Sequence, residues 1–175
     1  ITREYFKRLS DHNFDVKKIT DKAPQNFRWI GFIKTFFPNS KVIHCKRNPK
    51  DNCLSLFKNS FASSSMNWCY SQADVARYYK LYENLMIFWK SKLPDFIYDI
   101  KYEDLVSNQE QEIKKLIKFC KLDWDPSCLS HHKNNKTPIQ TASVSQARKP
   151  IYKSSINLNS NFSKHLKTMY DILDT

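Results

Sequence analysis

The chain has 175 residues, a single glycine and a formal net charge of +12. This length allows one domain with a buried core, and the charge favours an anionic partner such as a nucleotide, a nucleic acid, an acidic peptide or a sulfated sugar. The single glycine, Gly31, excludes a glycine-rich phosphate loop of the Walker or Rossmann type from this sequence. The basic residues are scattered along the chain, which argues against a nucleic-acid-binding stripe.

The predicted elements alternate between helices and short strands. Apolar periodicity and turn residues predict a helix end over 1–10, helices over 24–37, 49–60, 74–92, 108–121 and 161–173, and strands over 18–21, 41–45 and 96–101. Polar loops are expected over 62–72 and from the end of the 108–121 helix to residue 150. This alternation predicts an α/β fold, a three-layer α/β/α arrangement with a parallel sheet and right-handed crossovers, as a single domain over 1–175.

The stretch VIHCKRNPKDNCLSLF (42–57) carries the clearest chemical signal. Its strand ends just before Arg47, and a helix starts at Asn48-Pro49 with Asn48 as the N-cap. Ser55 lies two turns into this helix and leans back toward its N-terminus. An arginine, a hydroxyl and a helix N-terminus at the carboxyl end of a strand predict an anion site, most simply a phosphate site.

Two other predicted strands also end at polar residues. Lys22 follows the 18–21 strand, and Tyr102 follows the 96–101 strand. Ligands of parallel α/β sheets bind at the carboxyl ends of the strands, so Lys22, Arg47 and Tyr102 are expected to border one site.

The five cysteines form no C-x-x-C pair, and we expect buried, reduced thiols. Cys128 with His131 and His132 gives only a weak metal signal, so no metal site is expected.

No apolar run approaches the roughly 18 residues of a membrane span, and no signal peptide is visible. Reduced cysteines favour a cytoplasmic location, while the initial Ile suggests a piece of a longer protein.

At these residues the sequence resembles the sulfotransferases that use 3′-phosphoadenosine 5′-phosphosulfate (PAPS). The similarity runs through TDKAPQNFRWIGFIKTFFPNSKVIHCKRNPKDNCLSLFKNSF (20–61), ARYYKLYENLMIFWKSKLP (76–94), YDIKYEDLV (98–106), FCKLDWDPSCLSHH (119–132) and TASVSQARKPIYKSS (141–155). It is strongest to the bacterial branch related to tyrosylprotein sulfotransferases, which is often fused to tetratricopeptide repeats. The resemblance implies a P-loop-NTPase-like sulfotransferase fold and transfer of a sulfuryl group from PAPS to a hydroxyl or phenol acceptor, with protein tyrosine among the candidates.

The resemblance also implies roles for individual residues. Arg47 and Ser55 match the pair that holds the 3′-phosphate, and Tyr102 matches a tyrosine beside the adenine. Lys22 and Ser143 match the residues that assist the sulfuryl group in transfer. Further cofactor contacts are implied for a loop that closes over the nucleotide, through Gln146, Ala147, Arg148 and Lys149.

Several family features are absent from this sequence. Asn59 and Asn157-Leu158-Asn159 stand where the family shows basic residues or a basic-aromatic step. The first strand and the P-R-S-G-T-T loop around the 5′-phosphosulfate are also lacking, together with an acidic residue proposed as the base. We therefore expect this partial domain to hold the 3′-phosphate and to be weakly active or inactive by itself. The expected partners are the nucleotide and an acceptor hydroxyl or peptide, with no nucleic acid and no membrane segment, and a repeat region upstream in the parent protein.

Two other classes fit part of the pattern. A nucleotide kinase shares the parallel sheet but requires a G-x-x-x-x-G-K-[ST] loop. A basic domain that binds polyanions would show a contiguous basic face and steep salt dependence. Dependence on a 3′-phosphate separates the sulfotransferase from both.

Overall fold

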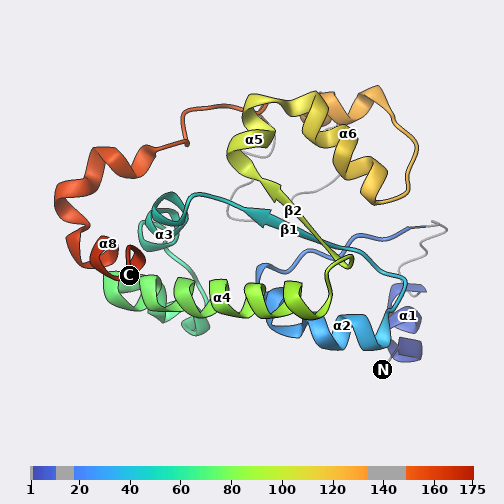
Figure 1. Cartoon of the computed structure of the whole chain (residues 1–175), viewed down its shortest axis with the longest axis horizontal. Helices are drawn as coiled ribbons and strands as arrows, with labels where there is room; N and C mark the ends of the chain where they lie inside the picture. Colours follow the sequence, from blue (N-terminus) through green and yellow to red (C-terminus); the bar gives the residue numbers. More distant parts are fainter. Residues whose placement is uncertain (1, 11–17, 134–148) are drawn as a thin grey trace. The chain divides into compact units, whose positions relative to one another are not determined.

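A computed structural model describes residues 2–10, 18–133 and 149–175 (Figure 1). Over these residues the protein is mostly helical, and its sheet has two strands in the order β1-β2. The elements are, in chain order, α1 (Thr2–Ser10), η1 (Pro24–Trp29), α2 (Ile30–Phe36), β1 (Val42–Lys46), α3 (Pro49–Phe57), η2 (Ser64–Tyr70), α4 (Gln72–Lys92), β2 (Ile97–Lys101), α5 (Tyr102–Ser107), α6 (Gln109–Phe119), η3 (Pro126–Lys133), η4 (Leu158–His165) and α8 (Lys167–Leu173).

The predicted α/β class is confirmed. The strands expected over 41–45 and 96–101 are β1 and β2, which run in the same direction in Figure 1. Each strand is followed by a helix: α3 begins three residues after β1, and α5 begins immediately after β2. The helices η2 and η3 lie in segments where the sequence pattern predicts loops, and the helix predicted over 161–173 is divided into the end of η4 and α8.

The strand predicted over 18–21 is wrong, because residues 18–23 have no regular secondary structure. Ile19 is the sole large apolar residue of this segment, and 44% of its surface is exposed. A strand is stabilised by burying alternate side chains against a neighbour, and this segment has too little apolar surface to do so.

The described chain divides into two compact units, one formed by 1–42 with 81–97 and the other by 43–80 with 98–175. The first unit has a core in which α2 packs against the second half of α4. Gly31 permits close contact, since a Cβ atom at this position would lie 2.8 Å from the Trp89 ring. The Trp89 indole N–H donates to the Phe27 carbonyl at 2.8 Å, which satisfies its polar atom. The core contains the buried residues Ile30, Met86, Phe96 and Ile97.

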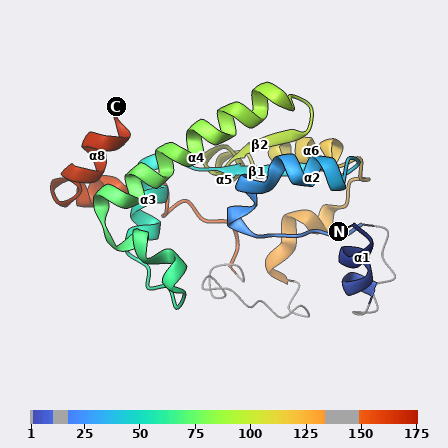
Figure 2. The same cartoon turned by 90° about the horizontal axis from the view of Figure 1, so that it is seen from below.

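The second unit contains α3, the first turns of α4 and the C-terminal elements. The side chain of Gln72, the first residue of α4, donates to the His165 carbonyl at 2.8 Å and accepts from the Met169 N–H at 3.4 Å. These contacts hold the end of η4 and α8 beside the start of α4, as Figure 2 shows. Met169 and Leu166 are buried there, so the C-terminus is packed onto the helices that precede it in the chain. No helix within the described ranges is long and apolar enough to cross a membrane.

Candidate anion-binding site

Arg47 is the central residue of the candidate site in the second unit. It follows β1 directly, and its Nη2 donates to the Ser155 carbonyl at 2.6 Å. Its guanidinium lies over the Tyr102 ring, 5.2 Å from the centroid. Its Nε is buried and has no hydrogen-bond partner among the described residues. A buried N–H without an acceptor is costly, so this atom marks where an acceptor is missing.

Tyr102, the first residue of α5, supports Arg47 from the second strand end. Its hydroxyl donates to the Tyr152 carbonyl at 3.3 Å. Burial raises the pKa of the Tyr102 hydroxyl, and the positive charge of Arg47 offsets only part of this effect. The phenol is therefore neutral at physiological pH and presents an aromatic face beside a cation.

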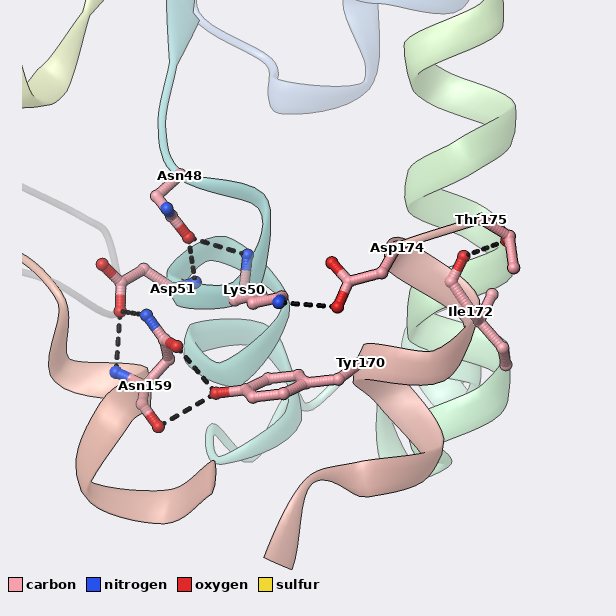
Figure 3. Close-up of polar contacts among 8 residues, drawn as sticks. All are labelled: Asn48, Lys50, Asp51, Asn159, Tyr170, Ile172, Asp174 and Thr175. Atoms are coloured by element: carbon pink, nitrogen blue, oxygen red, sulfur yellow. Dashed lines mark hydrogen bonds and ion pairs between the residues drawn. The ribbon is translucent and has the colours of Figure 1, made fainter. Parts of the chain in front are cut away.

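The N-terminus of α3 differs from the prediction in one respect. Asn48 is the N-cap, as expected, and its side-chain oxygen accepts from the backbone N–H groups of Lys50 at 3.0 Å and Asp51 at 3.2 Å (Figure 3). The Asn52 N–H bonds to the Asn48 carbonyl, and Pro49 has no N–H. The first turn therefore has no spare backbone donors for an anion, and recognition depends on side chains.

Ser55 lies in the second turn of α3, half-buried, and its hydroxyl makes no hydrogen bond to any described residue. No hydrogen bond joins Arg47 and Ser55 in this part of the chain. Both side chains therefore keep donors that a ligand could use.

Glu103, the second residue of α5, supports the N-terminus of α3. Its Oε1 accepts from the Asn48 N–H at 2.9 Å, so β2 and α5 fix the N-cap of the helix that follows β1. This contact and those of the Ser155 and Tyr152 carbonyls were not predicted from the sequence. Every residue has a backbone carbonyl, so the two carbonyl contacts leave no signal in the sequence. Glu103 does leave one, because it is an acidic residue just after the end of a predicted strand.

The remaining predicted site residues are placed as follows. Lys22 belongs to the first unit, is exposed, and makes no hydrogen bond or ion pair with the described residues. Lys149 is exposed. Four others lie outside the described residues: Ser143, Gln146, Ala147 and Arg148. In the described ranges no group of three His, Cys, Asp or Glu residues could hold a metal ion.

Comparison with known proteins gives three findings. The sequence profile of the sulfotransferase family matches residues 1–126. An uncharacterized protein of Aquifex aeolicus (strain VF5) is 33% identical over 171 residues, which are 97% of this chain and 22% of that protein. A Caenorhabditis briggsae protein, provisionally named as a protein-tyrosine sulfotransferase, is 23% identical over 124 residues, 71% of this chain and 44% of that protein. The chain thus spans less than half the length of either relative.

Proposed function

Because this chain belongs to the sulfotransferase family, we propose that it supplies the 3′-phosphate site of a domain that transfers a sulfuryl group from PAPS to a hydroxyl or phenol. The observation that carries this proposal is the buried Nε of Arg47, which has no acceptor in the described part of the chain. A phosphate oxygen would satisfy it with a charge-assisted hydrogen bond. The Ser55 hydroxyl, in the second turn of α3, would supply a second donor.

The neighbouring groups support a nucleotide rather than a free phosphate. Tyr102 presents a neutral ring at the end of the neighbouring strand β2, and an aromatic face suits a purine. The Ser155 carbonyl and the Tyr102 ring together restrain the guanidinium, so little side-chain entropy remains to be lost on binding.

Lys22 and Ser143 are proposed to act on the group in transfer, as the family resemblance implies. In the reaction, the bond from sulfur to the bridging phosphate oxygen breaks as a bond from the acceptor oxygen to sulfur forms, and the acceptor loses its proton to a base. Negative charge grows on the bridging oxygen, and a flexible ammonium suits its stabilisation. The Lys22 side chain is exposed and makes no hydrogen bond or ion pair with the described residues, which is consistent with this role. The name of the C. briggsae relative favours protein tyrosine as the acceptor to test first.

Calorimetry on the 175-residue chain tests the phosphate site. We expect adenosine 3′,5′-bisphosphate to bind more tightly than adenosine 5′-phosphate, and Arg47→Ala to cost about 2–4 kcal/mol for the bisphosphate alone. Arg47→Lys should recover only part of this loss, because an ammonium lacks the planar fork of donors. Arg77→Ala is the charge-matched control, since the Arg77 side chain is 67% exposed. Equal affinity of the wild-type chain for both nucleotides would contradict the proposal. A nucleotide kinase or a polyanion-binding domain would then be the functions to test next.

A further inference from the structure

Asp51 is the most deeply buried charged residue in the described chain, with 2% of its surface exposed. Its carboxylate accepts three hydrogen bonds, from the Asn157 N–H at 2.7 Å, the Asn159 N–H at 2.8 Å and the Asn159 side-chain amide at 2.9 Å. Figure 3 shows the carboxylate facing Asn159 from the first turn of α3. Carboxylates are almost never this buried unless their oxygens are satisfied, so the contact is a specific one.

The segment that Asp51 holds is the one that contacts Arg47. Ser155, whose carbonyl accepts from Arg47, is two residues before Asn157. The Ile156 N–H bonds to the Lys153 carbonyl at 3.0 Å, which folds residues 153–156 into a turn and limits how far Ser155 can move. Asn157 has a φ of 57°, a left-handed conformation that Asn tolerates better than most residues.

A second layer of contacts fixes Asn159 from the other side. The Tyr170 hydroxyl lies 2.7 Å from the Asn159 side-chain oxygen and 3.0 Å from its carbonyl. The Lys50 ammonium lies 4.5 Å from the Tyr170 ring centroid and 2.8 Å from Asp174. Lys50 is thus engaged with α8 rather than with Asp51, and within the described residues the three hydrogen-bond donors to Asp51 are neutral N–H groups.

We propose that Asp51 is a positioning residue of the 3′-phosphate site: by fixing residues 157–159 on α3 it holds the Ser155 carbonyl where it orients Arg47. This rests on the proposed function and adds a residue that touches neither nucleotide nor acceptor. Without the Asp51 contacts, the carbonyl no longer fixes the guanidinium, and the Arg47 Nε is no longer aimed at a phosphate oxygen.

The test compares Asp51→Asn with Asp174→Asn. Asparagine keeps the volume but replaces one acceptor oxygen with a donor that faces another donor, so at least one of the three hydrogen bonds to 157–159 is lost. Asp174→Asn is the control. It removes the ion pair between Lys50 and Asp174, whose side chain is 61% exposed, and so disturbs the end of α8 without changing residues 155–159. The readout is the ratio of the dissociation constant of adenosine 5′-phosphate to that of adenosine 3′,5′-bisphosphate.

We expect Asp51→Asn to lower this ratio by roughly tenfold, the loss of about one charge-assisted hydrogen bond, with affinity for adenosine 5′-phosphate nearly unchanged. Asp174→Asn should leave the ratio at its wild-type value. A purely structural role for Asp51 would weaken both nucleotides in parallel, and that result overturns the inference. So does a folded Asp51→Asn protein with the wild-type ratio.

Asn159→Ala provides a milder variant if Asp51→Asn does not fold, because it removes one of the three bonds and keeps both backbone donors. It should lower the ratio by a smaller factor, and an unchanged ratio in folded Asn159→Ala would count against the inference. A wild-type ratio near one is a separate result: it overturns the proposed phosphate site itself and this role with it.

Discussion

Asn48 determines what the start of α3 can offer to a ligand. Its side chain and carbonyl use the N–H groups of residues 50–52, so the helix contributes the field of its dipole but no spare donor in its first turn. An anion at this point must be held by side chains with longer reach, and Arg47 has a buried Nε that makes no hydrogen bond to the described residues. This makes the site depend on one arginine more strongly than a phosphate loop built from backbone N–H groups would.

The buried thiols give a prediction at the residue scale. Cys53 and Cys69 are fully buried, and burial, together with the nearby Cys69, raises the pKa of Cys53 from 9.0 to about 12. Partial burial of the thiol also raises the pKa of Cys45, but this residue is exposed. In the native protein at about pH 8 iodoacetamide should therefore modify Cys45 and spare Cys53 and Cys69. Peptide mapping by mass spectrometry, with a urea-denatured sample as the control, measures this. Equal labelling rates of Cys53 in the native and the denatured sample would contradict this prediction, because they would show that the folded protein exposes the Cys53 thiol freely.

The same pKa shift has a consequence for stability. The folded state holds the Cys53 proton more tightly than the unfolded chain, so this contribution is complete below about pH 9 and is lost as pH rises toward about 12. The free energy of unfolding should fall over this range, and Cys53→Ala should make the decline shallower.

Local signals explain which elements were predictable. The N-P-K-D motif predicts the first residue of α3 correctly, because an N-cap and a proline at the first helical position act within one turn. The strand predicted over 18–21 is wrong because strand formation depends on a partner that the local pattern cannot reveal. In the site, Arg47 could be found from its place at a strand end. Its contact with Ser155, 108 residues away, could not be found, because the acceptor is a carbonyl.

The end of α6 gives a prediction at the scale of an element. Lys121 has a φ of 54°, and the helix closes with bonds from the Lys121 N–H to the Lys118 carbonyl and from the Leu122 N–H to the Ile117 carbonyl. This is a Schellman ending, in which glycine avoids the strain that a Cβ atom causes. Lys121→Gly should raise the free energy of unfolding by about 1 kcal/mol in urea titration. Lys118→Gly, one turn earlier and inside the helix, should lower it by about 1 kcal/mol. A loss of stability in Lys121→Gly would mean that the lysine side chain contributes more than the backbone strain costs.

At the scale of the whole molecule, the question is whether the net charge of +12 or the site itself selects an anion. The two act over different distances. The general field of exposed lysines is screened within about 10 Å at 0.1 M salt and about 3 Å at 1 M salt, whereas a partly buried contact is screened much less. Heparin, which the exposed lysines would bind, and adenosine 3′,5′-bisphosphate therefore report on different parts of the molecule.

We expect heparin binding to fall steeply between 0.05 and 0.5 M NaCl, by a factor on the order of 10³, because each neutralised anionic group releases a counterion. Binding of adenosine 3′,5′-bisphosphate should fall by no more than about tenfold over the same range, if its 3′-phosphate binds the buried Nε of Arg47 as we propose. Arg47→Ala should weaken nucleotide binding by a similar factor at both salt concentrations and leave heparin binding almost unchanged, because one charge of 29 basic side chains is a small part of the field. Calorimetry for the nucleotide and fluorescence titration for heparin measure the two slopes. A nucleotide slope as steep as that of heparin, and insensitive to Arg47→Ala, would assign anion binding to the general charge and remove the case for a defined phosphate site.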